Sequence, residues 1–332
     1  MAIDVPFIWA IIIAFGIMMY VTLDGFDLGI GLLFPFIRAR EDRDVMISSV
    51  SPVWDGNETW LVLGGAALFA AFPLAYGVLL SALYLPLMMM LAGLIWRGVS
   101  FEFRIKASAA RKNFWDGAFC TGSYVATFSQ GVALGAFING FKLEGTTYTG
   151  SAFDCFTPFS IFVGFALMFA YSLLGTTWLI MKTTGPLQNR MRSIATVIAP
   201  VFLIVIAAVS LWTPLAHPEI AKRWFGWPNI IIFSPVPVLV LLSTLIQLIS
   251  LAKGGRALPF CLALLLMLLG YSGLGISLWP YIIPSTISIW SAAGPASSTA
   301  FALVGTLFII PIILVYTSWS YFVFRGRAVS YE

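Results

Sequence analysis

The chain has 332 residues, of which 60% are hydrophobic and only 10% are charged, and its mean hydropathy is +0.96. Soluble domains carry about 25% charged residues, so this composition excludes a soluble enzyme, a disordered segment and a nucleic-acid-binding domain. The formal net charge of +4 does not indicate nucleic acid as a partner, because the basic residues lie in short segments between long apolar runs. The chain is predicted to be an all-α polytopic membrane protein with a single membrane domain over residues 1–332.

Nine segments are predicted to cross the membrane, since a bilayer core of ~30 Å needs ~20 apolar helical residues. Two charge-free runs are long enough for two helices each. Residues 59–96 divide at Phe72-Pro73, and residues 257–324 divide at a stretch rich in Pro, Ser and Gly over 279–298. The predicted spans lie near residues 6–34, 53–73, 76–97, 117–138, 157–181, 194–214, 230–250, 257–278 and 300–323.

The basic residues predict the orientation of these spans. Fifteen of the eighteen Lys and Arg residues fall in alternate loops, beginning with the loop after the first span. By the positive-inside rule those loops face the cytoplasm. The amino terminus is then outside and the carboxyl terminus is cytoplasmic, which requires an odd number of spans. Residues 1–7 lack a basic region, so the first span is predicted to be retained rather than cleaved as a signal.

Four acids interrupt or open the first two spans. Asp24 and Asp27 lie three residues apart on the first span, which places them on one helix face. Asp55 and Glu58 have the same spacing at the start of the second span, for which Ser51 is a candidate N-cap and Pro52 a candidate first residue. A charge at the bilayer centre is disfavoured by roughly 2.5–3.5 kcal/mol or more, and such residues commonly mark ion or proton paths.

Two interpretations of these acids stay open. As a proton path, the four carboxyl groups take up and release protons in partly desolvated surroundings. Alternatively, Asp24 and Asp27 pair with a neighbouring helix as structural groups. Asp55 and Glu58 would then be solvated acids stabilised by the dipole at a helix start.

Further polar and aromatic residues lie near these acids. The third span ends at three charged residues, Arg97, Glu102 and Arg104. These residues suit contact with an anionic cofactor group or a partner subunit. The favoured interpretation is cytoplasmic anchoring with a local ion pair. Trp54 and Trp60 flank the acids of the second span, where packing is favoured over a functional role. In the first span, Gly25 and Gly29 form a small-xxx-small pair that predicts close approach of another helix.

The sequence offers no metal site and no catalytic residue set. His217, the single histidine, lies in a predicted outer loop, and the three cysteines are widely spaced and match no metal or disulfide pattern: Cys120, Cys155 and Cys261. Haem iron is usually held by His, Cys or Met, and one loop histidine cannot hold several haems. If the chain takes part in redox chemistry, the ligands must come from another subunit.

Several segments together resemble subunit II of cytochrome bd-type quinol oxidases. The first signature is VTLDGFDLGIG over residues 21–31, and the second is SPVWDGNETW over 51–60, followed by GGAALFA over 64–70. Residues 96–106, Trp115-Asp116 and residues 284–316 continue the resemblance, which spans nearly the whole chain. The short length is similar to the cyanide-insensitive branch of the family.

The resemblance implies a subunit of a terminal oxidase of the bacterial cytoplasmic (inner) membrane, which oxidises quinol and reduces dioxygen to water. Haems b and d, or b only, are then held by partner subunit I in a heterodimer. The implied fold is two four-helix bundles plus one peripheral helix. The family also includes members with a structural quinone in subunit II, and a small single-helix accessory subunit is a further partner that it allows.

The resemblance also implies roles for individual residues. By position, Asp24, Asp27 and Asp55 match acids on a cytoplasmic proton route, and Trp60 matches a tryptophan beside an apolar path for oxygen. Glu58 departs from members that carry an amide there. Two other functions remain as alternatives: a proton-coupled secondary transporter and a purely structural assembly subunit. Transporters often show interrupted helices in both halves, whereas one such region, 279–298, is visible here.

Overall fold

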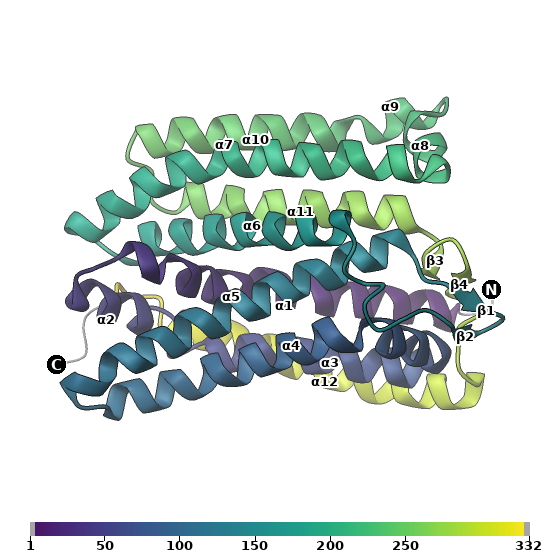
Figure 1. The fold of residues 1–332 in the computed structure, drawn as a ribbon, viewed down its shortest axis with the longest axis horizontal. Helices are drawn as coiled ribbons and strands as arrows, with labels where there is room; N and C mark the ends of the chain where they lie inside the picture. The colour runs from purple at the N-terminus through teal and green to yellow at the C-terminus, as the bar shows by residue number, and fades with distance from the viewer. Residues whose placement is uncertain (1–3, 329–332) are drawn as a thin grey trace.

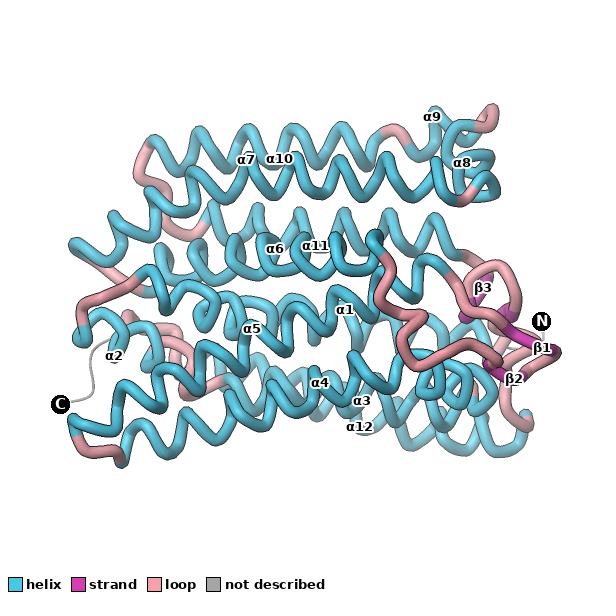
Figure 2. Tube along the Cα trace, in the orientation of Figure 1, coloured by secondary structure: helices cyan, strands magenta, loops and turns pink. Residues whose placement is uncertain are grey.

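The computed structural model describes residues 4–328, which are mostly helical (Figure 1 and Figure 2). The long helices are α1 Val5–Leu33, α3 Trp54–Ala71, α4 Pro73–Lys106, α5 Ala109–Asn139, α6 Pro158–Lys182, α7 Gly185–Ala216, α10 Pro235–Ala252, α11 Leu258–Leu278 and α12 Ala296–Val323. The shorter ones are η1 Phe34–Phe36, α2 Arg40–Ser48, α8 Pro218–Phe225 and α9 Asn229–Phe233. Two short antiparallel hairpins add to the predicted all-α fold: β1 Leu143–Glu144 with β2 Thr147–Tyr148, and β3 Tyr281–Ile283 with β4 Ile287–Ser288.

The helical membrane fold predicted from composition is confirmed. Each predicted span overlaps a long helix, and the span near 230–250 also covers α9. Within the described residues seven segments, rather than the predicted nine, are long and apolar enough to cross a membrane. These segments contain α1, α4, α6, α7, α10, α11 and α12. The two remaining long helices are α3, whose first turns hold the acids and amide of residues 55–58, and α5.

The boundary between α3 and α4 is as predicted, but the start of α3 is not. Proline lacks an N–H donor and disfavours helical geometry in the residue before it, so α3 ends at Ala71 and α4 begins at Pro73. Ser51 is not the N-cap of α3, because the unpredicted helix α2 runs into it through a turn. The amide of Ser51 donates to Ile47 O, and α3 begins only at Trp54.

The long helices run side by side along the longest axis of the molecule (Figure 1). In that view α7 and α10 lie along the top, α3, α4 and α12 lie along the bottom, and α1, α5, α6 and α11 lie between them. Helix α1 is central, since it packs against α3, α5 and α6. The start of α1 and the end of α12 lie at opposite ends of the long axis.

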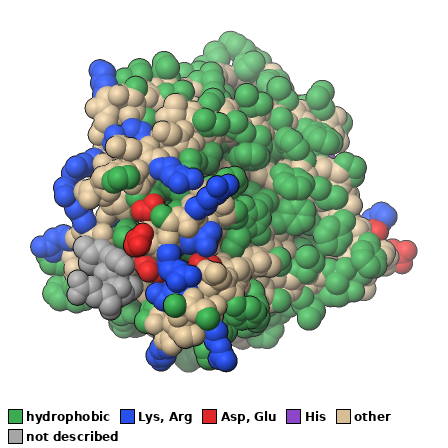
Figure 3. Space-filling model, turned by 60° about the vertical axis from the view of Figure 1, so that its left-hand side comes forward, with side chains coloured by type: hydrophobic (Ala, Val, Ile, Leu, Met, Phe, Trp, Pro, Cys, Tyr) green, Lys and Arg blue, Asp and Glu red, His purple; other side chains and the backbone are tan. Residues whose placement is uncertain are grey.

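The surface separates charge from apolar side chains along this axis. Figure 3 shows Lys and Arg gathered at the end that carries α2, beside a broad surface of hydrophobic side chains. Helix α12 contributes strongly to the apolar surface, with exposed residues including Phe301, Leu307, Phe308, Ile312, Val315 and Trp319. Such a surface suits lipid or another membrane subunit and does not suit water.

Glycines let α1 approach α6 closely, as the pair Gly25 and Gly29 predicts. A Cβ atom built on Gly29 would lie 1.9 Å from Tyr171 O, and one on Gly175 of α6 would lie 2.6 Å from Gly29 C. Both contacts are with backbone, which cannot move aside without separating the helices. Close backbone approach at small residues is a main source of packing energy between membrane helices, so this crossing fixes the position of α1.

Gly29→Ala is expected to destabilise the protein by roughly 1–3 kcal/mol, because the added methyl group overpacks the α1–α6 crossing. The thermal unfolding temperature of the purified protein in detergent measures the effect. Gly77→Ala in α4 is the matched control, since no atom lies within 4 Å of a Cβ built there. Equal unfolding temperatures for the two variants would contradict the role of this crossing.

Candidate functional site

The centre of the site is an ion pair buried between α1 and α4. Arg97 Nη1 lies 2.7 Å from Asp24 Oδ1, and both side chains are 0% exposed. Glu58 of α3 joins them, with Oε2 3.5 Å from Arg97 Nη2 and 25% of its side chain exposed. The three groups place one positive charge between two carboxyl groups. Glu58 is the member that reaches the surface of the chain.

Arg97 is not at the surface of the chain, where an anchoring residue would be expected. Helix α4 continues beyond Arg97 to Lys106, and it crosses α5 closely at Gly93 and Gly122. A Cβ on Gly122 would lie 2.7 Å from Arg97 N, so α5 packs directly against the backbone of Arg97. This packing buries the arginine inside the bundle, where only a pairing with carboxylates offsets its desolvation.

Asp27 lies one turn further along α1 and has different partners. Its carboxylate is buried and accepts a hydrogen bond at Oδ2 from Asn57 Nδ2 of α3, at 2.7 Å. Asn57 is itself held by Tyr321 of α12, whose hydroxyl donates to Asn57 Oδ1 at 2.8 Å. Neither Asn57 nor Tyr321 was singled out from the sequence. Asn57 stands between Asp55 and Glu58 in the second signature, but its partner is 264 positions away along the chain.

A second polar chain runs through the interior beside Asp24. Tyr171 Oη of α6 donates to Gln130 Oε1 of α5 at 2.9 Å, and Gln130 Nε2 donates to Tyr20 Oη of α1 at 2.6 Å. Tyr20 and Tyr171 are buried. Sequence analysis missed these three residues, because an isolated Tyr or Gln in an apolar helix carries no pattern of its own.

The structure does not gather all the predicted site residues. Asp55 is exposed on α3, whereas Asp24 and Asp27 are fully buried. Trp54 stacks on Phe101 with ring centroids 5.0 Å apart, and the buried Trp60 packs edge-on against Phe15 at 5.7 Å. Both tryptophans therefore have aromatic packing partners.

Another ion-pair cluster lies at the end of the bundle that carries α2. Arg104 contacts Asp116 of α5 at 2.5 Å and Asp44 of α2 at 2.6 Å, and Arg43 lies 3.1 Å from Asp116. Glu102 is exposed, whereas Arg104 is buried against α2 and α5 and forms its ion pairs there. Charged groups on three helices thus fasten α2 to the bundle.

The comparison with protein families decides the membership of the chain. The family described as cytochrome bd terminal oxidase subunit II matches residues 5–324. The chain belongs to this family. It is therefore a subunit of a bd-type quinol oxidase, an oxidoreductase complex, and a multi-pass protein of the inner membrane.

Individual relatives support the same membership. The cytochrome bd-I ubiquinol oxidase subunit 2 of Escherichia coli K12 is 29% identical, over 97% of this chain and 94% of that protein. The cytochrome bd ubiquinol oxidase subunit 2 of Bacillus subtilis 168 is 28% identical, over 96% of each. The solved bd oxidase from Geobacillus thermodenitrificans has a chain that shares the fold, with a TM-score of 0.76, 16% identity and coverage of 96% of this chain and 99% of that chain.

The single histidine of this subunit II lies beside a carboxylate at the start of a short helix. His217 caps the start of α8 and lies 3.6 Å from Glu219 Oε1. Among residues 4–328, no group of three or more His, Cys, Asp or Glu side chains is arranged to hold a metal ion.

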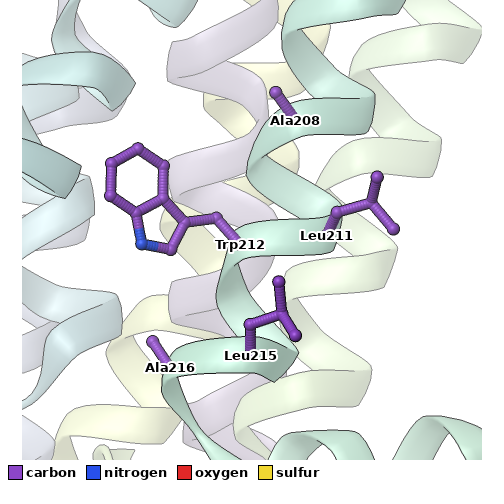
Figure 4. Close-up of a pocket in the computed structure, with 5 residues that line it drawn as sticks. All are labelled: Ala208, Leu211, Trp212, Leu215 and Ala216. Carbon is purple, nitrogen blue, oxygen red and sulfur yellow. The ribbon is translucent and has the colours of Figure 1, made fainter.

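An apolar depression on the surface of α7 is separate from the acids. It is lined by Ala208, Leu211, Trp212, Leu215 and Ala216 (Figure 4). No acidic or basic side chain lines it, so it offers no group for proton or electron chemistry. The buried polar residues around α1 are the better candidate site.

Arg97→Gln is expected to destabilise the purified complex by roughly 3–5 kcal/mol, because it leaves the buried Asp24 without its counter-charge. The double variant Asp24→Asn/Arg97→Gln should recover much of this loss, since it buries neither charge. Thermal unfolding of both variants measures the difference. Arg111→Gln, at an exposed position, is the matched control. An Arg97→Gln complex as stable as this control would contradict the importance of the Asp24–Arg97 pair.

Proposed function

We propose that this chain is the non-haem subunit II that scaffolds the haem-bearing subunit I and supplies cytoplasmic protons for the reduction of dioxygen to water. The observation that carries the proposal is the group Asp24, Glu58 and Arg97, buried in an apolar bundle with Asp27 one turn away. Intramembrane carboxyl groups are typical of proton relays. Haems b and d, or b only, belong to subunit I and supply the redox chemistry when bound.

The proposed path begins at the exposed acids and ends at the buried ones. Asp55 is exposed and Glu58 is partly exposed, so protons from water reach them first. Asp24 and Asp27 follow in the interior of the bundle. Arg97 lies against both Glu58 and Asp24. Its fixed charge stabilises either of these two carboxylates after a proton leaves, so neither Glu58 nor Asp24 becomes an isolated buried charge.

The scaffolding role is supported by the arrangement of helices. We infer two four-helix bundles, one of α1, α3, α4 and α5 and one of α6, α7, α10 and α11, with α12 as the peripheral helix against α3. The apolar outer surface of α12 and α3 suits subunit I and the surrounding lipid. Trp60, packed against Phe15 near the acids, borders the apolar region through which an uncharged gas would pass.

A structural assembly role is the second candidate, and the Asp24–Arg97 pair favours it specifically. A buried pair that never changes protonation would fix α1 against α4 without moving protons. Uptake by the isolated chain in proteoliposomes would instead support the transporter alternative. Enzyme assays on the assembled oxidase separate these roles, because a relay residue affects turnover whereas a structural residue affects assembly.

Asp24→Asn and Asp55→Asn are each expected to lower the rate of quinol-driven oxygen consumption by about tenfold or more, since an amide cannot carry a proton. The haem absorption spectrum of the purified complex should stay unchanged. Oxygen-electrode assays with equal amounts of haem measure the effect, and Glu41→Gln, at an exposed position on α2, is the control. Full turnover in both variants would contradict the relay, and loss of assembled complex would favour the structural role.

We also propose that the end carrying α2 faces the cytoplasm, because basic residues gather there (Figure 3). The hairpin β1–β2 lies at the opposite end (Figure 1). In a variant whose three native cysteines are replaced by alanine, Glu144→Cys should react with a membrane-impermeant thiol reagent in intact cells. Arg111→Cys should react only after the cells are opened. The reverse pattern would invert the orientation.

A further inference from the structure

The two oxygens of the Asp27 carboxylate have different surroundings. Oδ2 accepts the hydrogen bond from Asn57 Nδ2, whereas Oδ1 is fully buried and has no hydrogen-bond partner among the described residues. The charged and titratable groups around Asp27 lie on its own helix and on three neighbouring helices. They are Asp24 on the same helix, Glu58 on α3 and Arg97 on α4, with Tyr321 of α12 behind Asn57.

The orientation of the Asn57 amide is fixed by acceptors on one side. Nδ2 lies 2.7 Å from Asp27 Oδ2 and 3.3 Å from Leu23 O. Both of these oxygens accept hydrogen bonds when Asp27 is ionised, so a reversed amide would place its own oxygen against two acceptors. Asn57 Oδ1 therefore faces Tyr321, and because an amide oxygen cannot donate, the tyrosine hydroxyl is the donor.

Tyr321 is in turn held rigidly. Its ring packs edge-on against Trp178 and Phe26, with centroids 6.1 and 6.4 Å away. The end of α12 is fastened just beyond it, where Lys182 Nζ donates to Phe324 O at 2.5 Å. These contacts hold the hydroxyl in place. By donating to Asn57 Oδ1, it keeps Asn57 Nδ2 directed at Asp27 Oδ2. Four helices, α1, α3, α6 and α12, contribute to this arrangement.

We propose that Asp27 takes up its proton on Oδ1, with Asn57 and Tyr321 as positioning residues that hold Oδ2 as the carbonyl-type acceptor. The reason is that an oxygen already accepting an N–H bond is the better carbonyl, so the O–H bond forms on the opposite oxygen. The proton is transferred to Oδ1 from the preceding carrier of the proposed path, whose O–H bond breaks as the new O–H bond forms, and it later leaves from Oδ1 to the next acceptor. This inference rests on the proposed proton path and deepens it by naming the atom.

Infrared difference spectra of the assembled oxidase between low and high pH test the proposal. The wild type should show a protonated carboxyl band that is absent in Asp27→Asn, at a lower frequency than a carboxyl without hydrogen bonds. In Tyr321→Phe the band should move to higher frequency, since the amide is no longer held against Oδ2. Turnover should fall roughly three- to tenfold, as expected for the loss of one hydrogen bond.

Two further variants sharpen the test. Tyr271→Phe is the matched control, because it removes another tyrosine hydroxyl bonded to α1, at Ala14 O and 2.9 Å, and should leave the band unmoved. Asn57→Leu should move the band as Tyr321→Phe does or further, and adding Tyr321→Phe to it should have no additional effect. This epistasis is expected because Tyr321 acts through Asn57, and Asn57→Leu tests the proposal even where Tyr321→Phe does not assemble.

The outcomes distinguish a failure of the Oδ1 assignment from a failure of the proposed proton path. Absence of an Asp27-dependent band, or a band that neither variant moves, overturns the assignment of Oδ1, even if Asp27→Asn slows turnover. A band that moves as expected while Asp27→Asn keeps full turnover supports the assignment and instead contradicts Asp27 as a member of the path.

Discussion

The ion pair between Asp24 and Arg97 is the interaction on which the rest of the structure depends. Each side chain is fully buried at 2.7 Å from the other, in surroundings where either charge alone would be strongly destabilising. The pair is tolerated because both charges are present in fixed positions. It joins α1 to α4, and through Glu58 it also reaches α3, so three helices contribute to one charged group in an otherwise apolar bundle.

Small residues are what make this group possible. Gly29 and Gly175 bring α1 against α6, and Gly93 and Gly122 bring α4 against α5. Without a hydrophobic driving force between helices in lipid, such close contacts supply much of the association energy. The same contacts leave no room for lipid or bulk water around Arg97 and Asp24. Packing at glycines and pairing of charges are therefore two parts of one arrangement.

The site also has a graded exposure, from Asp55 at the surface through Glu58 to the fully buried Asp24 and Asp27. This gradient suits the proposed proton path. Asn57 and Tyr321 add an asymmetry at its inner end, because they give the two oxygens of Asp27 different chemistry. The second signature, residues 51–60, thus includes both Asp55 and Glu58 of the proposed path and Asn57, which donates to Asp27.

The sequence by itself determined the helical membrane fold, the break at Phe72-Pro73, the Gly25–Gly29 contact and the family, because hydropathy, proline and glycine act locally and the signatures are contiguous. It also pointed to Asp24, Asp27, Asp55 and Glu58, since charge in an apolar helix is conspicuous.

Only the tertiary structure decided the partners of these four acids. Arg97 was expected at the membrane surface, and Tyr321 and Gln130 were not noticed, because a partner dozens or hundreds of positions away is chosen by how helices pack and not by any periodicity along the chain. The same packing turned Asp55 outward while burying Asp24, although the spacing of the two acid pairs is identical.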